Sequence, residues 1–318
     1  MKIAHLSDLH LNTFFRESNI KSIKYLLKYA LEQSFDHLVI TGDLTDSANE
    51  RDFEILRKIF KASGLLNSNR LSVVIGNHDI FGGIQIPEDI FNFPERCKKV
   101  DYNKKVREFF DYFREIFDDC VYISKQNHFP YAKLIDDVLI TGLNSIPEYS
   151  KLKNPFASNG EIDFSQLNEM TEIFRMFKNS CRKRVLLIHH HFNKIKITNQ
   201  KSALGLWLNM EKQTMKLRKK KRLLNLFNMY EVDLVLHGHF HENIEYVRKN
   251  IKFLNAGASV KSNLPGELQI NFIEINTSKI ITETHKLVAG SSIVTHRNIH
   301  LLTHDTPAEK ELKAAANY

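Results

Sequence analysis

Five apolar stretches of the sequence each end in side chains that can bind metal ions. These side chains are carboxylates, an amide and imidazoles: Asp8, His10, Asp43, Asn77, His78, Asp79, His189, His237 and His239. Mixed oxygen and nitrogen ligands suit divalent ions such as Mn²⁺, Fe²⁺, Co²⁺ or Zn²⁺, and the absence of cysteine ligands argues against a closed structural zinc site. The set is larger than one ion with an open position needs, so it indicates two metal ions that share one carboxylate.

The apolar stretches predict buried strands that deliver these side chains to one edge of a sheet. Residues 72–75 are typical, because a β-branched run is closed by Gly76 and followed by Asn77. Helical spacing of apolar residues predicts helices over residues 17–33 and 47–61, between the first three strands. Strands that alternate with helices indicate a mostly parallel sheet, in which ligands bind beyond the carboxyl ends of the strands. We therefore expect the five clusters to converge.

The rest of the chain divides into insertions and a second group of strands. Residues 80–127, with an expected helix over 103–117, and residues 193–230 are interpreted as cap insertions. A helix is expected at 163–177, and strands are expected at 121–124, 131–135, 138–143, 243–247, 251–255, 268–275 and 280–287. The strands after residue 243 are predicted to form a second, mostly antiparallel sheet. We assign residues 1–287 to one domain and residues 288–318 to a C-terminal extension or tail.

Composition limits the classes of function. The chain has 318 residues, of which 42% are apolar, enough for a packed core. Lysine and arginine outnumber aspartate and glutamate by 45 to 37, and the resulting charge of +8 fits an anionic substrate. The sequence has three cysteines without a Cys-x-x-Cys pair, and it has no apolar run of membrane-spanning length. We expect a cytoplasmic protein, with a peripheral position at the inner membrane as the alternative.

Taken in order, the blocks resemble those of the calcineurin-like metallophosphoesterase superfamily, and look most similar to its bacterial phosphodiesterase branch, which includes cyclic-nucleotide enzymes. The blocks are Asp8-x-His10, Gly42-Asp43, Gly76-Asn77-His78-Asp79, the strand-terminal His189 and His237-Gly238-His239. The resemblance implies an α/β fold of the four-layer α/β/β/α type with helical cap insertions. It also implies a dinuclear metal centre between the two sheets.

The resemblance assigns roles to these residues. Asp8, His10 and His239 would hold one metal ion, Asn77, His189 and His237 would hold the other, and Asp43 would bridge the two. His78 would be the acid that faces the leaving group, and Asp79 would orient its ring. The triple His189-His190-His191 leaves the register open, and we choose His189 because it directly follows the apolar run. His241 follows the last block by two residues and could face the same cleft, and we interpret it as a surface or hydrogen-bonding residue.

The resemblance leaves several substrates open. We expect a phosphodiesterase that acts on a cyclic nucleotide or another small diester. A UDP-lipid-sugar pyrophosphohydrolase at the membrane surface is an alternative, because the aromatic insertion and the basic stretch 212–222 could form an amphipathic cap. That stretch is either a solvated helix face or a rim that attracts an anionic substrate. A nuclease is a third possibility, in which the stretch 212–222 would contact nucleic acid, and it would need a basic groove along several phosphates. Outside the enzymes, the chain could be a metal-binding scaffold on a degenerate phosphoesterase fold.

Overall fold

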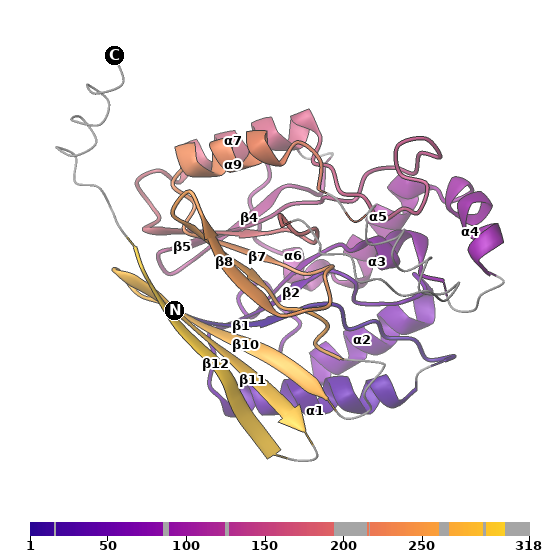
Figure 1. The fold of residues 1–318 in the computed structure, drawn as a ribbon, viewed down its shortest axis with the longest axis horizontal. Coiled ribbons are helices and arrows are strands. Elements are labelled where there is room, and N and C mark those ends of the chain that lie inside the picture. Colours follow the sequence, from indigo (N-terminus) through magenta and orange to yellow (C-terminus); the bar gives the residue numbers. More distant parts are fainter. Residues whose placement is uncertain are drawn as a thin grey trace.

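The chain folds into two six-stranded sheets, shown in Figure 1. The computed structural model describes residues 1–15, 17–84, 89–124, 127–193, 215, 217–260, 267–288 and 291–302. The first sheet has the order β12-β11-β10-β1-β2-β3, with β1 (Lys2–Leu6), β2 (His37–Thr41), β3 (Leu71–Val74), β10 (Leu268–Ile275), β11 (Lys279–Val288) and β12 (Ser291–Leu301). The second has the order β4-β5-β6-β7-β9-β8, with β4 (Tyr131–Ile135), β5 (Val138–Gly142), β6 (Lys183–Leu187), β7 (Leu234–His237), β8 (Ile244–Arg248) and β9 (Ile251–Asn255).

Helices cover the outer faces of both sheets, which gives a four-layer α/β/β/α sandwich. In Figure 1, α1 (Ser18–Glu32) and α2 (Glu50–Ala62) lie below the first sheet, and α7 (Phe164–Met176) and α9 (Lys220–Met229) lie above the second. The remaining helices follow β3 in the chain: α3 (Asn77–Phe81), α4 (Asp89–Lys98), α5 (Tyr102–Tyr112) and α6 (Arg114–Phe117). The layered architecture predicted from the sequence is confirmed.

Successive side chains along a strand point to opposite faces, and this explains how the second sheet packs against the first sheet on one face and against helices on the other. In β7, Leu234 and Leu236 belong to the core between the sheets, whereas Val235 packs with Leu223 and Phe227 of α9. Successive side chains of a strand point to opposite faces, so a fully apolar strand is what a sheet buried on both sides requires.

Parallel pairing places the ends of the site-bearing strands together. β1, β2 and β3 are parallel neighbours, as are β5, β6, β7 and β9. The carboxyl ends within each sheet therefore lie at one edge, as the sequence predicts.

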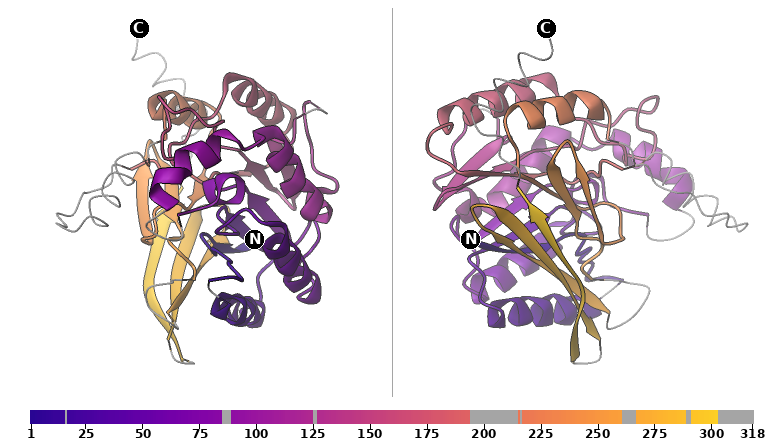
Figure 2. Two further views of the ribbon diagram at one scale, coloured as in Figure 1. Left: turned by 90° about the vertical axis from the view of Figure 1, so that its right-hand side faces the viewer. Right: turned by 60° about the vertical axis from the view of Figure 1, so that its left-hand side comes forward.

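The expected second sheet of late strands is wrong. β8 and β9 join β4–β7, whereas β10 pairs with β1 and continues the first sheet through β11. Each group has an apolar face that either sheet could bury, and the sequence pattern does not encode the partner strand. The region after residue 288, expected to be a tail, contributes β12, which forms the outer edge of the first sheet (Figure 2). Residues 303–318 lie outside the described residues.

The two predicted insertions have different outcomes. The helix expected over 103–117 is present as α5 and α6, which meet at Phe113, and α5 packs on α2 and α3. The strand expected at 121–124 is reduced to a single bridge between Val121 and Ala132. Of the second insertion, residues 194–214 and 216 lie outside the described residues. In the described part of the chain, no helix has the length and apolar character that a membrane span requires.

Candidate metal centre

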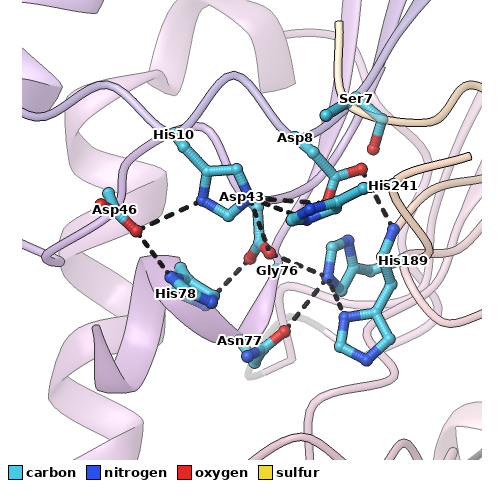
Figure 3. Close-up of polar contacts among 12 residues, drawn as sticks. Ser7, Asp8, His10, Asp43, Asp46, Gly76, Asn77, His78, His189 and His241 are labelled. Atoms are coloured by element: carbon cyan, nitrogen blue, oxygen red, sulfur yellow. Dashed lines mark hydrogen bonds and ion pairs between the residues drawn. The ribbon is translucent and has the colours of Figure 1, made fainter. Parts of the chain in front are cut away.

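The polar side chains that follow five strands meet between the two sheets (Figure 3). Among the described residues, three groups of histidine and aspartate side chains bring their ligand atoms within 4.8 Å of one another. One of them, His10, Asp46 and His78, overlaps another at His10, and the other two share no residue and are built from residues far apart in the sequence. The first group is Asp8, His10 and His241, and the second is Asp43, His189 and His239.

The first group joins the loop after β1 to the loop after β7. His10 Nε2 lies 3.2 Å from His241 Nε2, and Asp8 Oδ1 lies 3.5 Å from His241 Nε2 and 3.8 Å from His10 Nε2. Asp8 and His10 are buried, whereas 53% of the His241 side chain is exposed. The first group therefore lies where the centre opens to solvent.

The second group lies deeper. His189 Nε2 is 3.1 Å from His239 Nδ1, 3.3 Å from Asp43 Oδ2 and 3.2 Å from Asn77 Oδ1. All four side chains are buried. Asn77 thus adds an amide oxygen to this group, as expected from the sequence.

Asp43 connects the two groups. Its Oδ2 atom lies 3.3 Å from His189 Nε2 and 3.8 Å from His10 Nε2, so one carboxylate oxygen faces a nitrogen of each group. Its other oxygen, Oδ1, accepts a hydrogen bond of 2.9 Å from the backbone N–H of His78. Asp43 therefore lies where a shared ligand would have to lie.

The structure places His237 outside both groups. His237 is the last residue of β7 and points to the helix-covered face, where its ring contacts Phe192 and Phe253 and its Nε2 lies 2.9 Å from the hydroxyl of Tyr246. The sequence-based assignment is therefore shifted by two residues. His239 lies in the second group, where His237 was expected, and His241 lies in the first group, where His239 was expected.

The distance in sequence from the end of each strand distinguishes the residues that lie in the two groups. Asp8, Asp43, His189 and His239 each stand two residues beyond the last residue of β1, β2, β6 and β7. His237 belongs to the strand itself, so the pleat fixes its direction. His241 then repeats the Asp8-x-His10 spacing across Phe240.

Unusual backbone geometry aims these side chains. Asp8, His10, Asp43 and His239 have positive φ angles of 51°, 44°, 51° and 68°. Such left-handed conformations are uncommon for residues other than glycine and concentrate at functional sites, where the surrounding structure holds them.

Two glycines allow the loops to approach closely. A Cβ atom on Gly76 would collide with Asp43, and one on Gly238 would collide with Ser7 and Asp8. Only glycine lets the loops after β3 and β7 pack against the loops after β2 and β1.

His78 lies beside the first group, and a residue missed in the sequence holds its ring. Asp46 Oδ1 is 3.0 Å from His78 Nδ1 and 3.4 Å from His10 Nδ1. Asp46 follows Asp43 by three residues, on the same loop after β2, and this short spacing is the signal that could have identified it.

Asp79 does not orient His78, which corrects the expectation. Its Oδ1 accepts hydrogen bonds of 2.9 and 3.2 Å from the N–H and hydroxyl of Thr45, and its Oδ2 accepts one of 2.9 Å from the N–H of Gly76. Asp79 is fully buried at the start of α3, and it braces the loops that present Asp43 and Asn77.

Charges in the centre are interdependent. Burial alone would lower the pKa of His189, but the Asp43 carboxylate raises it to about 9. Burial likewise opposes ionisation of Asp43, and the neighbouring His189 holds the pKa of that carboxyl well below its usual range. Burial lowers the pKa of His239 far below its ordinary value. Burial and the nearby Asp43 raise the pKa of Asp79 to about 7.

The groups fit divalent metal ions. His189 Nδ1 lies 2.8 Å from the carbonyl of Thr41 and His239 Nε2 lies 3.1 Å from the carbonyl of Ser158, so both rings donate to backbone oxygens and turn their other nitrogens toward each other. A backbone partner that fixes the tautomer is typical of metal-binding histidine. Asp8 Oδ1 is buried and forms no hydrogen bond of normal geometry within the described residues. Two such groups that share a carboxylate between two sheets fit the class of dinuclear metal-dependent phosphoesterases.

Comparison with known families agrees with this class. The family model described as calcineurin-like phosphoesterase matches residues 1–243, and the chain belongs to this family. Members of the family hydrolyse phosphoesters and bind two divalent metal ions. No curated protein matches the chain.

Several solved structures share the fold. A dimetal phosphatase from Danio rerio has a TM-score of 0.58 and 9% identity, over 95% of this chain and 99% of that chain. GAP50, described as the anchor in the inner membrane complex of Plasmodium, has a TM-score of 0.53 and 12% identity, over 99% and 94% of the two chains. Purple acid phosphatase PPD1 from yellow lupin (Lupinus luteus) seeds has a TM-score of 0.53 and 13% identity, over 94% and 53%. At these identities the likeness shows the fold alone.

Proposed function

We propose that the protein is a dinuclear-metal phosphodiesterase that acts on a cyclic nucleotide or another small diester. The observation that carries this proposal is the pair of facing ligand groups joined by Asp43. Asp8, His10 and His241 would hold one metal ion, and Asn77, His189 and His239 would hold the other. The choice of a diester follows the resemblance of the sequence blocks to the phosphodiesterase branch.

The residues around the ligand groups support phosphoryl transfer. When bound, two divalent cations would supply Lewis-acid stabilisation of the charge on a phosphoryl group. His78 is close enough to the first group to serve as the proton donor to the departing alcohol, since its ring centroid lies 4.7 Å from that of His10. Asp46 holds Nδ1 of His78, so the ring directs its Nε2 side away from Asp46, and the carboxylate would stabilise an imidazolium.

A non-enzymatic scaffold on the same fold is the main alternative from another class. The fold does not decide between the two, because GAP50 shares it and is described as an anchor. The intact ligand groups and the His78–Asp46 pair favour an enzyme, since a scaffold has no need of a positioned proton donor beside metal ligands.

A substrate panel tests the proposal. Mn²⁺-loaded protein would be assayed with bis-p-nitrophenyl phosphate, p-nitrophenyl phosphate, cyclic AMP and a UDP-lipid analogue, with D43N as the inactive control. Turnover of diesters above monoester supports the proposal. Exclusive turnover of the monoester would replace it with a phosphatase, turnover of the UDP-lipid analogue alone would replace it with a pyrophosphohydrolase, and bound metal without any turnover would favour the scaffold.

A further inference from the structure

The histidine that follows His189 in the chain is fully buried beside the metal centre but belongs to neither ligand group. The ring centroid of His190 lies 4.4 Å from that of His239 and 5.4 Å from that of His189. A buried polar ring costs free energy unless its nitrogens are hydrogen-bonded. The partners of His190 therefore indicate what this ring does.

Both ring nitrogens of His190 contact the loop that joins β5 to α7. Nε2 lies 3.1 Å from the carbonyl oxygen of Ser158, and Nδ1 lies 2.8 Å from the hydroxyl of Ser145. Burial lowers the pKa of His190 well below its ordinary value, so the ring is neutral. Because a carbonyl oxygen can only accept, Nε2 carries the proton and donates to Ser158, and Nδ1 accepts from the Ser145 hydroxyl. The loop thus fixes one tautomer of His190.

The carbonyl of Ser158 is shared between His190 and a proposed metal ligand. It lies 3.1 Å from His190 Nε2 and 3.1 Å from His239 Nε2. A carbonyl oxygen has two lone pairs, so it can accept from both rings. His239 then turns its other nitrogen, Nδ1, toward His189 Nε2 at 3.1 Å, inside the second ligand group. One backbone oxygen therefore sets the direction in which His239 presents its ligand nitrogen.

The loop that carries this carbonyl is closed around the ring of His190. Ser145 Oγ accepts a hydrogen bond of 3.3 Å from the backbone N–H of His190, and the carbonyl of Ser145 accepts one of 2.9 Å from the N–H of Glu161. A Cβ atom at Gly160 would lie 2.4 Å from His190 Cγ, which shows how closely the backbone packs on the ring. The ring thus fills the space between Ser145, Ser158 and Gly160, and holds the loop in place.

We propose that His190 is a positioning residue, which holds the Ser158 carbonyl where that oxygen orients His239 in the second ligand group. The inference rests on the proposed phosphodiesterase function, since it takes His239 as a metal ligand. Loss of a group that hydrogen-bonds to a metal-binding histidine typically lowers metal affinity by about 10- to 100-fold. His190 acts one step further out, through the carbonyl, so its removal should change metal binding without removing a ligand.

Two amide variants of His190 differ by one methylene group and separate the two contacts of the ring. H190Q places its amide nitrogen near the position of Nε2, where it can still donate to Ser158. H190N places its amide near the position of Nδ1, next to Ser145, and does not reach Ser158. The pair therefore tests the hydrogen bond to the Ser158 carbonyl while both side chains stay polar.

H37N is the matched control, because it makes the same change at a fully buried histidine outside the centre. The ring nitrogens of His37 contact a carbonyl and a hydroxyl, as those of His190 do. Mn²⁺ binding to the full chain would be followed by electron paramagnetic resonance, which detects the free ion and gives the affinity of each site. Urea unfolding of the metal-free proteins and turnover of bis-p-nitrophenyl phosphate would be measured on the same samples.

H190N should bind one of the two Mn²⁺ ions about 10- to 100-fold more weakly than wild type, with the other ion little changed. H190Q should bind both ions nearly as wild type does, because it restores the donor to Ser158. H37N should also bind both ions as wild type does, although H190N and H37N both unfold at lower urea concentrations. Turnover by H190N should recover toward the wild-type value as Mn²⁺ is raised.

The comparison between variants decides the proposal. Equal weakening of metal binding in H190N and H37N would assign the effect to lost stability, and equal weakening in H190N and H190Q would show that the donor to Ser158 is irrelevant. Either result overturns the role of His190, as does wild-type metal binding in H190N.

A milder variant keeps the proposal testable if H190N does not fold. S145A removes the partner of Nδ1 and leaves the imidazole present, so it should weaken binding of one ion by less than H190N would, and unchanged binding in S145A would then overturn the proposal. Absence of diester turnover in wild type, with this pattern of metal binding retained, would instead overturn the phosphodiesterase proposal and leave the role of His190 standing.

Discussion

Asp46 holds two histidines of the centre with one carboxylate oxygen. Its Oδ1 lies 3.0 Å from His78 Nδ1 and 3.4 Å from His10 Nδ1, and the two rings meet edge to face. The proposed proton donor and a proposed metal ligand are thus positioned by the same atom. Asp46 therefore acts through other groups, as a positioning residue.

D46N should keep the metal ions and lose most of the turnover. An asparagine can still contact one ring, but it cannot stabilise an imidazolium at His78, so kcat should fall by about 10²-fold with little change in KM. The pH profile of kcat should lose its dependence on the protonated donor. Steady-state kinetics at saturating Mn²⁺ and metal analysis would measure these effects. A D46N enzyme with wild-type kcat and an unchanged pH profile would remove Asp46 from the mechanism.

The variants H241A and H237F distinguish two sets of metal ligands. The structure indicates His239 and His241, whereas the sequence predicts His237 and His239. H241A should lose affinity for one of the two ions, because His241 faces Asp8 and His10. H237F should retain both ions, because His237 packs against Phe192 and Phe253 and its Nε2 contacts the hydroxyl of Tyr246. Metal content by mass spectrometry after gel filtration gives the answer.

The Tm of H237F separates a packing role of His237 from a role as a metal ligand. Loss of the hydrogen bond to Tyr246 should cost about 1 kcal/mol and lower Tm by a few degrees. A lower Tm with two bound ions therefore agrees with a packing role. Loss of one ion from H237F together with full occupancy in H241A would restore the original assignment.

D43N should lose bound metal and activity together, whereas H78A should lose activity alone. The asparagine can still accept the hydrogen bond from the His78 N–H, but it lacks the charge that two cations would share. His78 contributes its backbone N–H to Asp43, and this contact survives replacement of the side chain. Metal analysis and diester turnover would be measured on both variants. Full occupancy in D43N would contradict the shared-ligand role.

The sequence predicted the layers and most members of the centre because both depend on local pattern. Buried strands ending in polar residues identify Asp8, Asp43, Asn77 and His189 without knowledge of any partner strand. The pairing of β10 with β1 was not predictable in the same way, because an apolar strand offers the same surface to either sheet. Strand pairing depends on tertiary contacts that the local pattern does not specify.

The errors at the centre have a common physical cause. Whether His237 is the last residue of β7 or the first residue beyond it decides where its side chain points, and strand ends are the least certain feature of a sequence pattern. The role expected of Asp79, to orient His78, belongs to Asp46 for a related reason. The loop after β2 turns back toward His78, and that turn is set by contacts such as those between Asp79 and Thr45.

Protonation of His37 should weaken the folded state in mild acid. His37 is the first residue of β2 and is buried at the end of that strand opposite to Asp43. Its Nδ1 lies 2.8 Å from the carbonyl of Asn69, and its Nε2 lies 2.8 Å from the hydroxyl of Ser72. Burial, followed by the charge of Lys133, lowers its pKa from 6.5 to about 3. The unfolded chain therefore binds more protons than the folded chain between these pH values, so His37 stabilises the fold above about pH 6.5 and this contribution is lost as the pH falls toward 3.

H37Q tests this pH dependence against the exposed H296Q as the matched control. Near pH 7.5, the free energy of unfolding of H37Q should be about 1 to 2 kcal/mol lower than that of wild type, because hydrogen bonds are lost. Between pH 6.5 and 5 that difference should shrink by about 1.4 kcal/mol per pH unit, since only wild type has the buried imidazole. Urea unfolding at several pH values, with a chelator present so that metal release does not contribute, measures the difference. A constant difference between H37Q and wild type across this range would show that His37 does not resist protonation in the fold.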